Sequence, residues 1–255
     1  MKTVGAVALA MLALGGQAAI AKGAEKPNII VFIVDDYDKP ETSVYGGKVL
    51  TPNLERLARE GMTFHNAYMT STVCTPSRYT CLTGRYAGSS HSSAYLSEFP
   101  KGTQGLPAFN VALEKDHMNV GRVLAENGYA TGLVGKYHVG GEESHSPELL
   151  KNYGLHAVPK NVPWSEEINR KQFENEKIHR QMIKEQGFTW AKNIYWGNMN
   201  APFKGHNPEW TTAAALEFIE EHQDGPFYLH YGTTLLHGPN GEWHRSLSKP
   251  LVTNE

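Results

Sequence analysis

The sequence predicts an α/β protein with a mostly parallel central sheet. Three runs of β-branched and aromatic residues, at 28–34, 130–134 and 227–232, have the composition of strands in a buried parallel sheet. Segments of helical composition separate them, and polar or charged side chains follow each run. Open α/β sheets bind their ligands at the carboxyl ends of the strands. We therefore expect one ligand site, built from the residues that follow these strands.

Residues 1–21 have the composition of a secretory signal peptide. Lys2 precedes an apolar run from Val4 to Leu14, and Ala19-Ile20-Ala21 forms a small-x-small cleavage site. The run is shorter than the roughly 20 residues that a membrane-spanning helix needs, and no later segment is long enough either. A buried first helix is the alternative interpretation. We expect an exported protein, periplasmic or extracellular, with no membrane span.

The composition is that of an ordinary globular protein. Apolar residues make up 40% of the chain, and 24 basic residues face 26 acidic ones, so the net charge is −2. No general basic field is available for nucleic acid, and an anionic substrate has to be held by local cations. Residues 26–255 suffice for one α/β domain with a substantial core.

Two carboxylates, Asp35 and Asp36, follow the first predicted strand directly. Adjacent carboxylates at the end of a hydrophobic strand repel each other and are costly to desolvate, and a cation between them relieves both effects. Hard oxygen ligands favour calcium or magnesium over zinc. An acidic turn in solvent is the alternative, and these residues alone do not exclude it.

A helix is expected to begin at Pro52 and to end at Gly61. Thr51 can cap it, proline suits the first helical position, and glycine is a common stop. A short strand is expected around 63–68, directly before the segment that organises the predicted site.

That segment reads Cys74-Thr75-Pro76-Ser77-Arg78, followed by Leu82-Thr83-Gly84-Arg85. Pro76 suits a helix start, so Cys74 would lie at a helix entrance, where N–H groups and the helix dipole favour an anion. Arg78 would share its face and offer a planar fork of donors to a tetrahedral oxyanion. An inert buried thiol is one alternative. A disulfide to Cys81 is disfavoured, because seven helical residues correspond to about 10 Å of rise.

A second group of donors follows the predicted strand at 130–134, which a helix at 120–126 precedes. Lys136 and His138 are two residues apart, and alternate residues of an extended segment point the same way. An ammonium and an imidazole can therefore face one pocket. A solvated lysine and a capping histidine are the alternative.

The last predicted strand, 227–232, follows an amphipathic helix at 209–222. His237 stands just beyond the strand, in Leu236-His237-Gly238-Pro239. His230, inside the strand, is interpreted as a core histidine. A charged helical segment at 166–186 provides no site residue.

Together these motifs resemble the sulfatase family, and the resemblance covers nearly all of residues 26–240. The Cys-x-Pro-Ser-Arg pentapeptide with its Leu-Thr-Gly-Arg partner is similar to the family signature. It implies an alkaline phosphatase-like α/β/α sandwich. The other similar segments are the strand before Asp35, Thr51-Pro52-Asn53-Leu54, Gly135-Lys136-Tyr137-His138, where the family more often has tryptophan third, and the His-x-Pro element at His237.

The resemblance implies sulfate-ester hydrolysis through a covalent intermediate. A maturation enzyme would oxidise Cys74 to formylglycine, whose hydrate offers two hydroxyls, one of which attacks sulfur. Asp35, Asp36 and the modified Cys74 would hold Ca²⁺, or Mg²⁺. The substrate would be a sulfated small molecule or carbohydrate.

The remaining matched residues would serve the charge and the protons of that reaction. Arg78 and Lys136 would stabilise the nucleophile and the sulfuryl oxygens. Lys136 and His237 would bind the sulfate, and His237 would assist the leaving alcohol. His138 would help to deprotonate the second hydroxyl, so that sulfate leaves and the aldehyde is regenerated.

The sequence also departs from the family pattern. Sulfatases complete the metal site with a later Asp-Asn or Asp-His pair, but only 18 residues follow His237 and none of them is aspartate. We therefore expect the amino-terminal part of a sulfatase, truncated at the C-terminus, whose activity in this form is doubtful. A phosphonate or phosphodiester hydrolase of the same superfamily and a non-catalytic sulfatase-like binding protein remain as alternatives.

Overall fold

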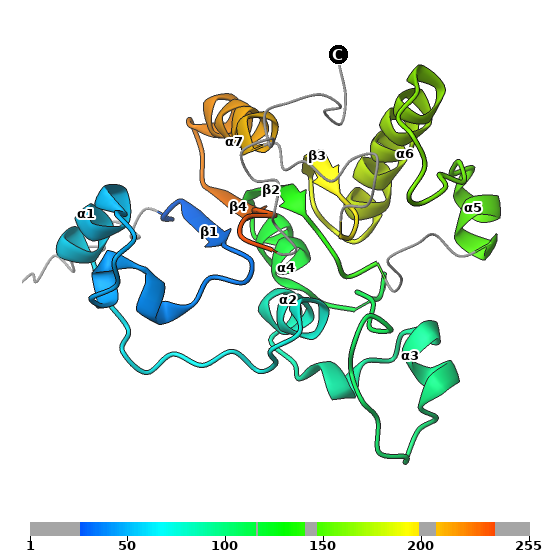
Figure 1. Cartoon of the computed structure of the whole chain (residues 1–255), viewed down its shortest axis with the longest axis horizontal. Coiled ribbons are helices and arrows are strands. Elements are labelled where there is room, and N and C mark those ends of the chain that lie inside the picture. Colours follow the sequence, from blue (N-terminus) through cyan, green and yellow to red (C-terminus); the bar gives the residue numbers. More distant parts are fainter. Residues whose placement is uncertain (1–25, 116, 141–146, 199–207, 238–255) are drawn as a thin grey trace, which may run out of the picture.

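The computed structural model describes residues 26–115, 117–140, 147–198 and 208–237 (Figure 1). The predicted signal peptide, 1–21, lies outside these ranges. Within them, no helix combines the length and the apolar character that crossing a membrane requires.

Four parallel strands form the central sheet, in the order β1-β4-β2-β3. They are β1 (Ile29–Ile33), β2 (Ala130–Lys136), β3 (Trp190–Tyr195) and β4 (Phe227–Gly232). Gly232 at the end of β4 is level with Ile33 of β1 on one side and with Gly135 of β2 on the other. The carboxyl ends of these three strands therefore meet at one edge, and the predicted parallel sheet is confirmed.

Helices cover both faces of the sheet, which gives three α/β/α layers (Figure 1). α7 (Pro208–His222) packs its Phe218 on the face that carries Val134 and Leu229. The opposite face, which carries Leu133, is covered by α2 (Cys74–Thr83), α4 (Val120–Glu126) and α6 (Glu166–Glu185). The remaining helices are α1 (Pro52–Glu60), α3 (Ser93–Glu98), α5 (Pro147–Tyr153) and the short 3-10 turns Lys39–Glu41, Ser43–Tyr45 and Ala87–Ser89.

Most of the predicted helices begin and end at the expected residues. α1 starts at Pro52 and stops before Gly61. The side chain of Asn119 accepts a hydrogen bond from the Arg122 N–H at 3.1 Å and so caps α4. α2 starts at Cys74, two residues before Pro76, which lies within the first turn, where its missing N–H costs nothing.

Two expectations about strands are wrong. The first strand is not buried on both faces, because β1 lies at the edge of the described sheet, and Ile30 and Phe32 are each 52% exposed. Residues 63–68 form no strand. Their carbonyls are bonded by side chains instead, since Tyr45 Oη donates to the Phe64 carbonyl at 2.9 Å and Lys39 Nζ donates to the His65 carbonyl.

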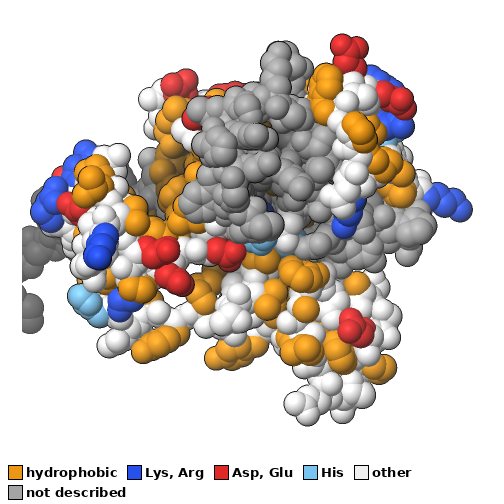
Figure 2. Space-filling view, viewed as in Figure 1, with side chains coloured by type: hydrophobic (Ala, Val, Ile, Leu, Met, Phe, Trp, Pro, Cys, Tyr) orange, Lys and Arg blue, Asp and Glu red, His pale blue; other side chains and the backbone are white. Residues whose placement is uncertain are grey.

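This segment presents apolar side chains to solvent. Met62, Phe64, Tyr68 and Met69 are all exposed. Figure 2 shows hydrophobic side chains along the lower edge of the molecule, where Figure 1 draws this stretch of the chain. A strand would need a neighbour for its backbone groups, and the described part of the chain provides none here.

Candidate active site

The predicted site residues lie at or beyond the ends of β1, β2 and β4 and in α2, and they meet at the carboxyl edge of the sheet. Two backbone hydrogen bonds join the segments after β1 and β4: the Asp35 N–H donates to the Leu235 carbonyl at 2.8 Å, and the Leu236 N–H donates to the Asp35 carbonyl at 2.7 Å. They bring His237, the next residue, to the same edge as Asp35.

Asp35 is the buried acceptor at the centre of the site. Its Oδ1 lies 3.2 Å from Arg78 Nη2, and its Oδ2 accepts from Lys136 Nζ. All three side chains are buried. Burial alone would raise the pKa of Asp35, but the charges of Arg78 and Lys136 outweigh it and hold the pKa below its ordinary value. The carboxylate is therefore ionised at neutral pH.

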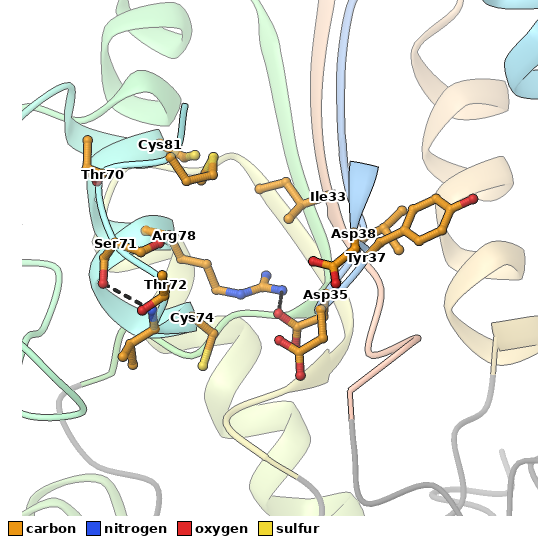
Figure 3. A pocket seen from close by; sticks show the side chains of 15 residues that line it. Ile33, Asp35, Tyr37, Asp38, Thr70, Ser71, Thr72, Cys74, Arg78 and Cys81 are labelled. Atoms are coloured by element: carbon orange, nitrogen blue, oxygen red, sulfur yellow. Dashed lines mark hydrogen bonds and ion pairs between the residues drawn. The ribbon is translucent and has the colours of Figure 1, made fainter. Parts of the chain in front are cut away.

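Arg78 links α2 to two strands. Its guanidinium reaches from the helix to Asp35 (Figure 3), and its Nη1 donates to the Lys136 carbonyl at 2.7 Å. This approach needs a glycine at the end of β4, because a Cβ at Gly232 would lie 2.5 Å from Arg78 Nη1 and 2.6 Å from the Lys136 carbonyl oxygen.

Cys74 stands at the first position of α2, as predicted, and contacts the candidate base. Its Sγ lies 3.3 Å from Nδ1 of His138. Burial, then the charges of Lys136 and Arg78, lower the pKa of His138 to about 3, so the imidazole is uncharged at neutral pH. Phe109 stacks on this ring, with centroids 5.4 Å apart.

The expectation that Lys136 and His138 point the same way from an extended segment is wrong. His138 has a φ of 52°, in the left-handed region, so the chain is not extended beyond β2. The two side chains therefore diverge onto neighbouring partners, Lys136 onto Asp35 and His138 onto Cys74.

A cavity of about 580 Å³ opens beside this cluster. It is lined by Asp35, Asp36, Cys74 and Arg78, and also by Cys81 (Figure 3). Cys74 and Cys81 form no disulfide with each other. Lys136, His138 and His237 are not among its lining residues, although His237 is close enough to contribute to the lowered pKa of His138.

The carboxylate oxygens of Asp35 and Asp36 are ligands of the type that a hard divalent cation binds, but they are few. Asp36 is exposed beside buried Asp35, and both line the cavity with Cys74. Among the described residues, no group of three or more His, Cys, Asp or Glu side chains is gathered closely enough to hold a metal ion. Calcium takes about 6–8 oxygen ligands, so these residues supply part of such a site.

Comparison with known proteins identifies the family of the chain. The sequence profile described as Sulfatase matches residues 27–246. The chain belongs to the sulfatase family. An arylsulfatase of Hemicentrotus pulcherrimus is 28% identical over 216 residues, which are 83% of this chain and 37% of that protein. An N-acetylgalactosamine-6-O-sulfatase of Bacteroides thetaiotaomicron is 39% identical over 122 residues, 47% of this chain and 22% of that protein.

Solved structures confirm the alkaline phosphatase-like fold of this sulfatase chain. A putative sulfatase from Bacteroides fragilis superimposes with a TM-score of 0.52 and 22% identity, over 87% of this chain and 45% of that one. The chain thus spans less than half the length of the relatives and the structure compared here.

One residue that contacts the candidate site was not predicted from the sequence. Asn198 follows β3, and its Oδ1 accepts from Lys136 Nζ at 2.7 Å. Lys136 is therefore held by Asp35 and Asn198 together. The available signal was position, since Asn198 stands just past a strand, as Asp35 does, but that strand was not predicted.

His230 is the core residue that the sequence indicated. It is buried within β4, and its Nδ1 lies 2.9 Å from the Tyr228 hydroxyl. Burial, and to a smaller extent the charge of Arg78, lower its pKa to about 3.

Proposed function

We propose that this chain carries the catalytic centre of a sulfuric ester hydrolase, with formylglycine derived from Cys74 as the nucleophile. The observation that supports it is the connected set of contacts around Cys74: His138 touches the thiol, and Arg78 and Lys136 converge on Asp35 beside the same cavity. Family membership provides the reaction class.

The first half of the reaction transfers the sulfuryl group. One hydroxyl of the formylglycine hydrate gives up its proton to solvent and attacks sulfur, and the bond between sulfur and the ester oxygen breaks. His237 donates a proton to the departing alcohol. Arg78 and Lys136, which Asp35 holds in place, stabilise the negative charge on the sulfuryl oxygens.

The second half releases sulfate without water attacking sulfur. His138 accepts the proton of the remaining hydroxyl, the carbonyl re-forms, and the bond to the sulfate oxygen breaks. Water then rehydrates the aldehyde. A cysteine thiol could not complete this step, because it has no second hydroxyl. The Nδ1 of His138 lies 3.3 Å from Cys74 Sγ, which places it within reach of a hydroxyl at position 74.

Asp35, Asp36 and the oxidised side chain at position 74 would hold Ca²⁺, with Mg²⁺ as the alternative. A bound divalent cation would favour ionisation of the attacking hydroxyl and offset the charge of the sulfate.

The chemistry of the relatives suggests the substrate class and the setting. The Bacteroides relative is named for a sulfated amino sugar, and we propose a sulfated carbohydrate or a small sulfated molecule here. Conversion of Cys74 requires a maturation enzyme, and the sequence of residues 1–21 supports export before the protein acts.

Turnover and the chemical state of residue 74 test the proposal together. Purified protein is incubated with 4-nitrophenyl sulfate, released sulfate is quantified, and the peptide containing residue 74 is examined by mass spectrometry. We expect turnover only in preparations with formylglycine. Cys74→Ala should abolish it, whereas the matched change Cys81→Ala should retain it. Turnover by Cys74→Ala, or faster hydrolysis of an aryl phosphonate than of the sulfate, would contradict the proposal.

A further inference from the structure

A buried carboxylate outside the cavity collects donors from three segments of the chain. Glu114 is almost fully buried. Burial alone would raise the pKa of Glu114, but the hydrogen bonds that its carboxylate accepts, first among them the one from the His91 N–H, outweigh this effect and hold the pKa below its ordinary value. Its donors are the Tyr79 hydroxyl at 3.1 Å from each oxygen, the Ser90 hydroxyl at 3.1 Å, the His91 N–H at 2.7 Å and Arg85 Nη2 at 3.3 Å.

On one side, Glu114 holds the helix that begins with Cys74. Tyr79 is fully buried within α2. Gly84 ends the helix with a φ of 68°, and this left-handed turn sends Arg85 back, so that its Nη2 donates to the Tyr79 hydroxyl at 2.7 Å. The Leu-Thr-Gly-Arg motif thus fastens the carboxyl end of α2 to Glu114.

On the other side, Glu114 belongs to the segment that fixes His138. Its neighbour Leu113 donates its N–H to the Val139 carbonyl at 2.8 Å, and Ala112 forms an antiparallel bridge with Gly140. Since Val139 directly follows His138, the backbone at 112–114 helps to fix where the imidazole lies, together with the Trp196 carbonyl, which accepts from the His138 N–H at 3.0 Å.

These contacts form a closed ring that runs from Cys74 along α2 to Tyr79, across Glu114 to Val139, and back through His138 Nδ1 to Cys74 Sγ. We infer that Glu114 is a positioning residue, which sets the separation between the nucleophile at position 74 and His138. The effect of Glu114 on catalysis rests on the proposed function, whereas its effect on the position of His138 does not.

Stability alone is a weak explanation for this carboxylate. Replacing a buried ion pair by well-packed apolar residues is often neutral or stabilising, so burying the Glu114 carboxylate against Arg85, whose side chain is 34% exposed, gains little energy. A buried hydrogen-bond network whose polar groups are all satisfied fixes one arrangement of its side chains, even where it adds little stability. Catalysis depends on that geometry, because a misplacement of about 1 Å can cost about a hundredfold in rate.

Glu114→Gln tests the inference, since it keeps the shape and replaces one acceptor oxygen by a donor that conflicts with the surrounding donors. Lys115→Gln is the matched control, because the neighbouring Lys115 pairs with Glu185 at the surface. The readouts are the ¹⁵N resonances of the His138 ring, kcat and KM for 4-nitrophenyl sulfate per formylglycine-containing molecule, and the melting temperature. We expect shifted His138 resonances and kcat lower by about tenfold or more, with KM within about twofold.

The resonances of His138 do not depend on turnover, so the two proposals can fail separately. Shifted resonances in Glu114→Gln, with no turnover by any form of the protein, would support the positioning role and refute the proposed function. A lower melting temperature with unchanged His138 resonances and unchanged kcat would overturn the inference. If Glu114→Gln does not fold, Tyr79→Phe removes only one donor to the carboxylate, and the same outcomes decide.

Discussion

Gly232→Ala should dismantle the centre of the site from the backbone side. The new Cβ would lie 2.5 Å from Arg78 Nη1 and 2.6 Å from the Lys136 carbonyl oxygen, two atoms that are themselves joined at 2.7 Å. Neither can move easily, because the carbonyl belongs to β2 and the guanidinium is also held by Asp35. Arg78 has to leave its position.

The expected loss follows from two costs. Overpacking a buried site costs about 1–3 kcal/mol, and losing a hydrogen bond from a charged donor costs about 1.5–3 kcal/mol. The free energy of unfolding should therefore fall by about 2.5–6 kcal/mol. For a domain of this size, that lowers the melting temperature by roughly 5–24 °C.

Thermal unfolding followed by circular dichroism measures this loss, and urea unfolding gives the free energy directly. Gly225→Ala is the matched control, because a Cβ there would meet no atom within 4 Å, and it should be neutral or slightly stabilising. A Gly232→Ala protein that melts within about 2 °C of the wild type and keeps its activity would refute the steric reasoning.

Three further expectations concern the site and its surroundings. Asn198→Ala should lower kcat/KM for an aryl sulfate about tenfold through the loss of one acceptor for Lys136, whereas the exposed Gln223→Ala should not; equal values for the two variants would contradict this. Because hydrogen bonds lower the pKa of Glu114 despite its burial, its stabilising contribution is complete above the ordinary glutamate pKa of about 4.3 and is lost as pH falls through the lower folded-state value. Urea unfolding at several pH values should therefore show that the free energy of unfolding falls less on acidification in Glu114→Gln than in the wild type. The same pH dependence in both proteins would exclude this contribution of Glu114. Excess chelator should stop turnover and calcium should restore it better than zinc; full activity in chelator would rule out the cation.

The sequence predicted those parts of the fold in which local pattern and tertiary role agree. β1, β2 and β4 are apolar runs, and each ends at or shortly before a predicted site residue: Asp35, Lys136 and His237. Since parallel strands align their carboxyl ends, the positions of these residues relative to the apolar runs were enough to predict that they lie close together.

β3 could not be predicted, because polar residues interrupt it. Lys192 pairs with Glu217 of α7 at 2.8 Å, and Asn193, with a φ of 54°, donates to the Trp210 carbonyl at 2.5 Å. These partners are distant in the chain, so no local pattern reveals that the polar residues are satisfied within a sheet. Asn198 was missed with the strand that places it.

The opposite error occurred where a strand was expected but the described part of the chain provides no partner. Residues 63–68 include the aromatic Phe64 and Tyr68, yet no neighbouring strand lies beside them among the described residues. Likewise, the apolar run of β1 was expected to be covered on both faces, but coverage depends on sheet order, and β1 lies at the edge of the described sheet.

The place of β4 in the sheet has a consequence for how the chain acquires its structure. β4 is the last strand along the described chain, but it lies between β1 and β2. During synthesis, β1 and β2 cannot pair with β4 until residues 227–232 have been made, and strand pairings between residues so distant in the chain are slow to form. Until then the edge of β1 and its apolar side chains stay open to other chains, so nascent protein is most prone to aggregate just before β4 is made.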